Sequence, residues 1–232
     1  MNPFAEPKNY NEMLTKIMAF TFVISLALVA VVAHNWPKLW NCLHPSWLTF
    51  SIEVLGLKNV PTAYLVVAFL ISLIARISKL HDKISDLFGI RERFDLNEIL
   101  IPLAGGTGVA VDLAKRKRLI ESRGQIMGQV FYKYASSTNP VIDAHLIWTA
   151  LDKWSWFWIC IEGTTVSVVA SIMLLSVHAF LSAACLEALI VVCTLAATQV
   201  NRACASAAHN EVREILADAQ RCHDVGVALS AI

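Results

Sequence analysis

Four runs of apolar residues, each 16 to 24 residues long, restrict what this sequence can fold into. A helix needs about 20 apolar residues to cross the roughly 30 Å of hydrocarbon in a bilayer. Hydrocarbon offers no partner to backbone N–H and C=O groups, so each span must satisfy these groups internally, as a helix does. The runs predict an all-α polytopic membrane protein with four transmembrane helices, over residues ~17–34, ~59–77, ~154–176 and ~178–199.

The placement of Lys and Arg predicts how these spans are oriented. Cytoplasmic loops are enriched in both residues. Residues 76–153 carry twelve of them, whereas residues 34–59 carry only Lys38 and Lys58. We therefore expect both termini and the middle segment in the cytoplasm of a bacterium, the first loop (35–58) outside, and the spans in the inner membrane. Three tryptophans of the first loop also suit a membrane–water boundary: Trp36, Trp40 and Trp47.

This topology divides the chain into two hairpins and two cytoplasmic parts. These are an N-terminal transmembrane hairpin (1–79), a cytoplasmic helical segment (80–153), a C-terminal transmembrane hairpin (154–199) and a cytoplasmic C-terminal helix (200–232). About three residues, from Ser176 to His178, remain to turn between the third and fourth runs, so those helices should form a tight antiparallel pair.

Composition agrees with a membrane protein. Only 16% of the residues are charged, against about a quarter in soluble domains. The net charge of +1 shows no overall signature of nucleic-acid binding, so nucleic acid is an unlikely partner. The six cysteines show no CxxC and no regular spacing, so they read as packing residues.

Local signals predict helices in the cytoplasmic segment. The second span should continue as a helix up to Gly89, a residue suited to the left-handed conformation that ends helices. Asp95 should cap a short helix that Pro102 ends, and GGTG (105–108) should be a loop. Residues 109–136 show rough helical periodicity.

The two remaining cytoplasmic helices adjoin the second hairpin. Asn139 and Pro140 should begin a helix that leads into the third span. The fourth span should continue as a helix to about Val225, with one apolar face. Such a face must pack on the middle segment or on a second copy. We therefore expect a homo-oligomer.

Two acids, Glu162 and Glu187, lie near the middle of the third and fourth runs. Charged residues at that depth are costly and are functional candidates by default. In one interpretation, both are hydrogen-bonded to hydroxyl groups, such as those of Thr165 and Thr194, and hold helices together. In a second interpretation they line a water-filled path for a cation or proton. In a third they are catalytic.

Small residues near these acids predict close helix packing. Gly163, Ser167 and Ser171 are spaced four apart on the third run, and Ala183 shares a face with Glu187 on the fourth. Small residues at such spacing let membrane helices approach closely. The same stripe would also serve simply to close the hairpin on itself.

A basic cluster in the cytoplasmic segment predicts contact with lipid or another anion. It consists of Lys115, Arg116, Lys117 and Arg118. Anionic lipid headgroups attract such clusters. The GGTG stretch before it matches neither a P-loop nor a dinucleotide-binding pattern, which favours a plain connection over a phosphate site.

One pair of residues resembles a known catalytic motif. Arg202 and His209, with six residues between them, resemble the Arg-(four to six residues)-His motif of HEPN ribonucleases, which cut RNA across a dimer of helical domains. Ala203 departs from the polar residue that usually follows the arginine in that family. The resemblance implies a membrane-tethered ribonuclease as one alternative function.

The remaining patterns imply no metal and no cofactor. Cys204, His209, Cys222 and His223 match no zinc-ligand spacing. The preferred interpretation is a non-enzymatic membrane sensor or effector, in which a cytoplasmic domain meets a protein partner or ligand and the spans respond. That layout is similar to the layout of small multispanning proteins of bacterial anti-phage systems. An ion or proton-coupled transporter or channel using Glu162 and Glu187 is the main alternative.

Overall fold

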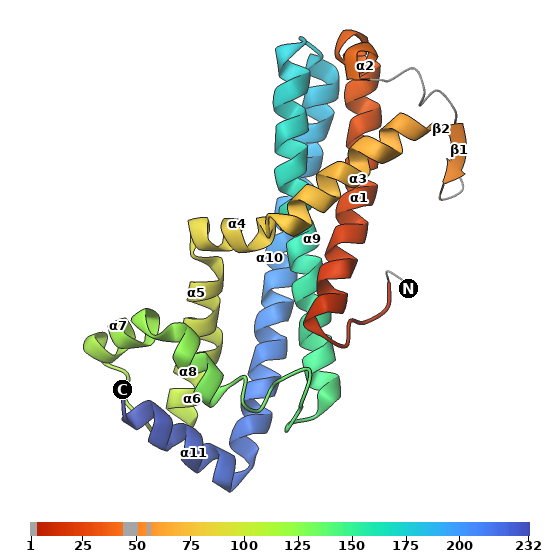
Figure 1. Ribbon diagram of the computed structural model, residues 1–232. Coiled ribbons are helices and arrows are strands. Elements are labelled where there is room, and N and C mark those ends of the chain that lie inside the picture. The colour runs from red at the N-terminus through yellow and green to blue at the C-terminus, as the bar shows by residue number, and fades with distance from the viewer. Residues whose placement is uncertain (1–3, 44–50, 55–56) are drawn as a thin grey trace. The chain divides into compact units, whose positions relative to one another are not determined.

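The computed structural model describes residues 4–43, 51–54 and 57–232, and the order of their elements is shown in Figure 1. Helices make up nearly all of this part of the chain, and the strands form one antiparallel pair, β1 (Ser51–Val54) with β2 (Leu57–Pro61). The all-helical fold predicted from the sequence is confirmed. Trp47, predicted at the membrane boundary, lies outside the described residues.

Three helices are long and apolar enough to cross a membrane: α1 (Tyr10–Asn35), α9 (Ala144–Ser176) and α10 (Phe180–Ala217). This agrees with a membrane location. α1 begins before its apolar run, because Asn9 and Glu12 cap it: Asn9 Oδ1 accepts from Glu12 N (2.9 Å), and the Glu12 carboxylate accepts from Lys8 N (2.8 Å).

The chain divides into two compact units. The first unit contains Leu14–His81 and Trp156–Thr198, and the second contains Phe4–Met13, Asp82–Ser155 and Gln199–Ile232. The first therefore holds the apolar parts of α1, α9 and α10. The second holds most of the segments predicted to be cytoplasmic.

In the first unit, α9 and α10 form an antiparallel pair. Three residues, 177–179, connect them, and His178 adopts a left-handed conformation (φ 59°) where the sequence predicts a turn. Ala170 and Leu174 of α9 pack against Ala183 and Leu186 of α10, in one buried cluster that also includes Leu28 of α1. α2 (Pro37–Leu43) follows α1.

The second apolar run differs from its prediction as a single span continuing to Gly89. β2 extends to Pro61, so the helix α3 (Thr62–Ile77) has 16 residues, or about 24 Å at 1.5 Å per residue. Lys79 then takes a left-handed conformation (φ 50°), and α4 (Leu80–Phe88) continues at an angle of 54°. α3 alone is too short for a span, but α3 and α4 taken together are long and apolar enough for one.

In the second unit, Gly89 has the predicted left-handed conformation (φ 59°), but the expected short helix is wrong. α5 (Ile90–Phe94), a π-helix (Asp95–Leu100, η2) and α6 (Ile101–Gly106) follow one another without a break. Asp95 is therefore inside a helical stretch and caps nothing. Pro102 does not end this stretch, since the wide π turn before it relieves the usual clash of a proline ring with the carbonyl four residues back.

The predicted GGTG loop is half wrong. Gly105 and Gly106 belong to α6, and the turn comes at Thr107 and Gly108 (φ 73°). A Cβ atom on Gly106 would lie 2.3 Å from Cδ1 of Leu216. Glycine at this position is therefore what lets α6 and α10 approach so closely.

Three further helix boundaries differ from the predictions. The helix expected over 109–136 is two helices, α7 (Leu113–Glu121), which Asp112 caps, and α8 (Arg123–Val130). α9 begins at Ala144, with Asp143 Oδ1 accepting from His145 N (2.9 Å), and not at Pro140. The C-terminal helix breaks at Asp218, which caps α11 (Ala219–Ser230). In each case an aspartate side chain caps the start of the observed helix, because its carboxylate accepts from backbone N–H groups of the first turn.

Candidate functional site

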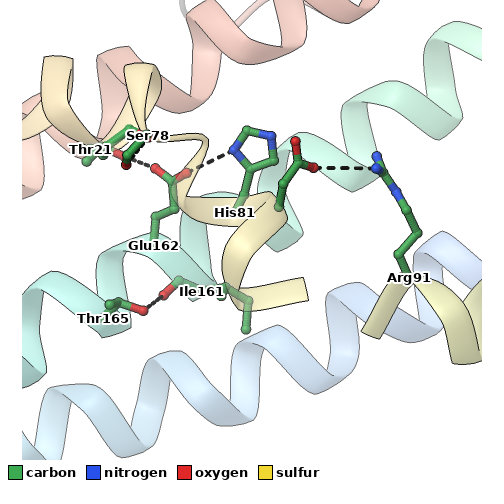
Figure 2. Close-up of polar contacts among 9 residues, drawn as sticks. Thr21, Ser78, His81, Arg91, Ile161, Glu162 and Thr165 are labelled. Carbon is green, nitrogen blue, oxygen red and sulfur yellow. Dashed lines mark hydrogen bonds and ion pairs between the residues drawn. The ribbon is translucent and has the colours of Figure 1, made fainter. Parts of the chain in front are cut away.

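The buried carboxyl group of Glu162 is the centre of the candidate site in the first unit. Glu162 is 2% exposed and lies in the apolar part of α9. Thr21 of α1 donates a hydrogen bond from Oγ1 to Glu162 Oε2 (3.0 Å). His81 of α4 places Nδ1 3.3 Å from Glu162 Oε1. Figure 2 shows both side chains directed at the carboxyl group.

The break between α3 and α4 positions His81. Ser78 Oγ donates to the carbonyl of Ala75 at the end of α3, and Lys79 then reverses the sign of φ. His81 is the second residue of α4, so its orientation depends on this turn. The imidazole is buried, and its ring lies 5.8 Å from the Trp158 ring.

The neighbouring residues of α1 and α9 bring the two helices close at this point. A Cβ atom on Gly163 would lie 2.8 Å from Ile24 Cδ1, so the absence of a side chain allows the contact. One turn before Thr21, Lys16 is also buried, and its ammonium lies 4.7 Å from the centre of the Trp156 ring. The site thus joins a carboxyl, a hydroxyl and an imidazole group, with a cation–aromatic contact beside it.

These groups can bind and exchange protons. A carboxyl group accepts hydrogen bonds when ionised and donates one when protonated, and imidazole changes charge between pH 5 and 8 when unperturbed. The Thr21 contact is a hydrogen bond whether or not the carboxyl group carries a proton, whereas the His81 contact can be a hydrogen bond or an ion pair.

The second acid of the apolar runs does not join this site. Glu187 is exposed on α10, and its Oε1 accepts from Ser171 Oγ of α9 (3.2 Å). Thr165 and Thr194, which the sequence grouped with the acids, each donate to a carbonyl of their own helix, Ile161 (2.9 Å) and Ile190 (2.8 Å). The two acids therefore have separate surroundings.

The predicted packing residues lie at helix contacts of the first unit. Gly163 faces Ile24 of α1, and Ala183 belongs to the cluster with Ala170 and Leu174. Ser167 and Ser171 are both buried.

The predicted catalytic pair has ordinary contacts in the second unit. Arg202 is exposed and donates to Gln199 Oε1 (3.4 Å), while His209 Nε2 lies 3.0 Å from Glu98 Oε2 of the π-helix. The contacts of Arg202 and His209 thus go to different groups. Within the described part of the chain, no three His, Cys, Asp or Glu residues are grouped to hold a metal ion.

The basic cluster of α7 is partly engaged by the protein itself. Arg116 donates to Asn97 Oδ1 (3.2 Å), Lys117 lies 3.8 Å from Glu121, and Arg118 donates to the backbone oxygen of Ile232. Lys115 is half-buried and its backbone N–H donates to the capping residue of α7. Exposure remains high for Arg116, Lys117 and Arg118, so an anion can still reach them.

The second unit holds its own buried acids. Asp95 of the π-helix pairs with Arg123 (2.9 Å); burial raises its pKa to about 6, and Arg123 and Arg91 oppose that rise. Glu211 lies on α10 beyond the apolar run, and burial alone raises its pKa to about 8. Burial, assisted by Asp95, also raises the pKa of Tyr132 to about 12.

Comparison with known proteins assigns the chain to a family. The model of the YmfE protein family matches residues 9–224, nearly the whole chain. This chain belongs to the YmfE protein family. It is 25% identical over 185 residues to a protein of Escherichia coli (strain K12) described as uncharacterized protein YmfE. The matched stretch covers 75% of this chain and 72% of that protein. No solved structure matches it.

For this YmfE family chain, sequence reasoning found Glu162 but missed its partners. His81 follows Arg76 and Lys79, so it reads as a residue of a solvated helix outside the membrane. The left-handed turn at Lys79 brings His81 back to α9, and no pattern in the sequence predicts that turn. Thr21 was missed because a threonine in an apolar run usually bonds to its own helix, as Thr165 does.

Proposed function

We propose that this protein is a non-enzymatic sensor of the bacterial inner membrane, in which the Glu162–His81 contact links the membrane-spanning bundle to a cytoplasmic unit. In this proposal the chain crosses the membrane four times, with the bent pair of α3 and α4 as the second span and both termini in the cytoplasm. The excess of Lys and Arg in residues 76–153 supports that orientation.

One observation carries the proposal: the partner of the buried acid is the last residue of the first unit before the chain enters the second. His81 contacts Glu162 in the first unit, and the next residue, Asp82, belongs to the second. Displacement of α4 by a partner or ligand would therefore strain the contact made by His81. A change at Glu162 would act on α4 in the reverse direction, since coupling between sites is reciprocal.

Contacts within the second unit carry the effect onward from α4. Asp82 Oδ1 lies 3.4 Å from Arg91 Nη1, and Arg91 N donates to Ser85 Oγ (3.1 Å). Arg91 also interacts electrostatically with Asp95, which pairs with Arg123. A line of charged pairs thus runs from α4 through α5 to the π-helix and α8. An anti-phage role for such a sensor stays a prediction.

Hydrogen exchange of the whole protein in lipid nanodiscs tests the coupling. Glu162→Gln keeps the size of the side chain and removes its charge. We expect faster amide exchange in α4 and α5, because His81 loses the carboxyl group that it contacts. Glu187→Gln is the matched control, and we expect it to leave these two helices unchanged. Equal exchange in α4 for the parent and both variants would contradict the coupling. Fused reporters at both ends test the orientation, and both should report the cytoplasm.

A proton-coupled transporter is the second candidate. The observation that favours it is Ser25, one turn after Thr21 on α1: the residue is fully buried, and its hydroxyl has no hydrogen-bond partner among the described residues. A line from Glu162 past Thr21 to such a hydroxyl would suit proton transfer through the bundle. Purified protein in vesicles with a pH-sensitive dye tests this: Glu162→Gln should abolish flux if the protein transports protons, and a parent that shows no flux excludes this candidate.

A further inference from the structure

Glu187 is a polar group on the least covered of the long apolar helices. Of the most apolar 18-residue stretch of α10, 17% is buried, against 39% for α1 and for α9. Glu187 is exposed, and its Oε1 accepts a hydrogen bond from Ser171 Oγ of α9. In the four-span arrangement proposed above, this side chain faces lipid near the middle of the bilayer.

The exposed positions around Glu187 form a stripe and not a uniform apolar surface. With a repeat of 3.6 residues, four exposed residues share its side of α10: Ala184, Val191, Thr194 and Thr198. The hydroxyls of Thr194 and Thr198 donate to carbonyls of their own helix (2.8 and 2.7 Å), so Glu187 is the side chain of this stripe that is poorly suited to contact with acyl chains. Exposed large apolar residues such as Leu189 and Val192 lie on other sides of the helix and are suited to it.

We propose that this stripe of α10 is the contact surface for a second copy of the chain. The inference rests on the membrane embedding of the proposed function. Copies inserted in the same direction are related by an axis along the membrane normal, so equal positions meet at equal depth. The carboxyl group is then self-complementary, because a protonated carboxyl group donates to and accepts from the same group of the other copy. Ala184, with its small side chain, allows the helices to approach closely.

Other coverings of the stripe are less well matched to it. Acyl chains supply no hydrogen-bond partner for Glu187. A different protein would need its own donor at the depth of Glu187. A second copy supplies the matching group by symmetry.

Cysteine cross-linking in native membranes tests the surface. In a cysteine-free background, Val191→Cys and Ala184→Cys place thiols on the stripe. Leu189→Cys is the matched control, since Leu189 (53% exposed) and Val191 (58%) are equally open in one copy. We expect dimers from the two stripe positions and not from Leu189. Equal cross-linking at all three positions, or none at the stripe, would overturn the proposal.

A second measurement uses the natural cysteines and so does not depend on that background. Energy transfer between labelled copies in vesicles gives the dissociation constant. Glu187→Leu should weaken association at least about tenfold, a change of about 1.4 kcal/mol, whereas Glu187→Gln should weaken it less because the amide still donates and accepts. Unchanged association in Glu187→Leu would contradict the proposal.

Alkaline extraction of the same membranes separates the two proposals. Release of the protein would contradict the proposed membrane embedding and, with it, the proposed sensor. If the protein stays in the membrane but does not cross-link at the stripe, only the proposed contact surface is contradicted.

Discussion

Two buried acids, Glu162 in the first unit and Glu211 in the second, are nearly equally hidden from solvent, at 2% and 5% exposure, yet their surroundings differ. Glu162 has a hydroxyl partner and an imidazole partner. Glu211 has a pKa set by burial alone, about 8. Burial of a carboxyl group therefore has two outcomes in this molecule: a specific contact between three helices in one unit, and a group that takes up a proton in the other.

The largest difference should appear on removing the imidazole partner. His81→Ala leaves Glu162 buried with one hydroxyl, and breaking a buried pair costs about 3 kcal/mol or more. We expect a lower midpoint of thermal unfolding for the whole protein in detergent. The control is His81→Gln, whose amide keeps a donor and should recover part of the loss. A midpoint for His81→Ala equal to that of the parent would mean that the contact does not stabilise the protein.

The opposite sign is expected for Glu211→Gln. The folded pKa of about 8 lies above the ordinary 4.5 of a glutamate, so the folded state binds a proton more tightly than the unfolded state. Stability is therefore lost as pH rises from 4.5 to 8. Gln never ionises, so the variant should be more stable than the parent by about 3 kcal/mol at pH 7 and by little at pH 4.5.

Unfolding by denaturant across that pH range measures this effect. Tyr132 interacts electrostatically with Glu211, but its pKa of about 12 keeps it protonated throughout this range. A variant whose advantage over the parent does not grow between pH 5 and 8 would show that Glu211 is not the proton-binding group.

A smaller effect should follow loss of the ion pair at the π-helix. Arg123→Ala removes the cation 2.9 Å from Asp95. Asp95 has a pKa of about 6, so it is ionised above that pH and the pair contributes there. We expect a loss of about 2 kcal/mol at pH 8 and much less at pH 5, measured by the same unfolding curves. A loss that is equal at both pH values would indicate a packing role for Arg123 instead.

The smallest change concerns the hydroxyl partner of Glu162. Thr21→Val keeps the shape of the side chain and removes one hydrogen bond, which contributes about 1 kcal/mol. Thr165→Val is the matched control, because that hydroxyl bonds to its own helix and should matter less. If the two variants lose the same stability, the Thr21 contact has no special value.

The same comparison shows how far sequence reasoning reaches. The helix pair of α9 and α10 and its turn follow from run lengths, because an apolar run and a polar break are local features. The bend after α3 does not, since it depends on one left-handed residue, Lys79, which sequence does not mark as it would a glycine.

Glu211 shows a second limit. In the sequence it lies in the C-terminal helix, for which an apolar face is predicted, but the pattern does not say which segment covers that face. Its burial comes from packing in the second unit between segments far apart in the chain. Patterns within one helix do not contain that information, so both Glu211 and the partner of Glu162 needed the three-dimensional structure.

A double-mutant cycle of Glu162→Gln and His81→Gln, measured by unfolding of the whole protein in detergent, tests the central claim most directly. If the two side chains are in contact as described, the cycle should give a coupling free energy of about 1.5 kcal/mol. Losses that simply add, with a coupling near zero, would show that the two residues act independently and would contradict the account.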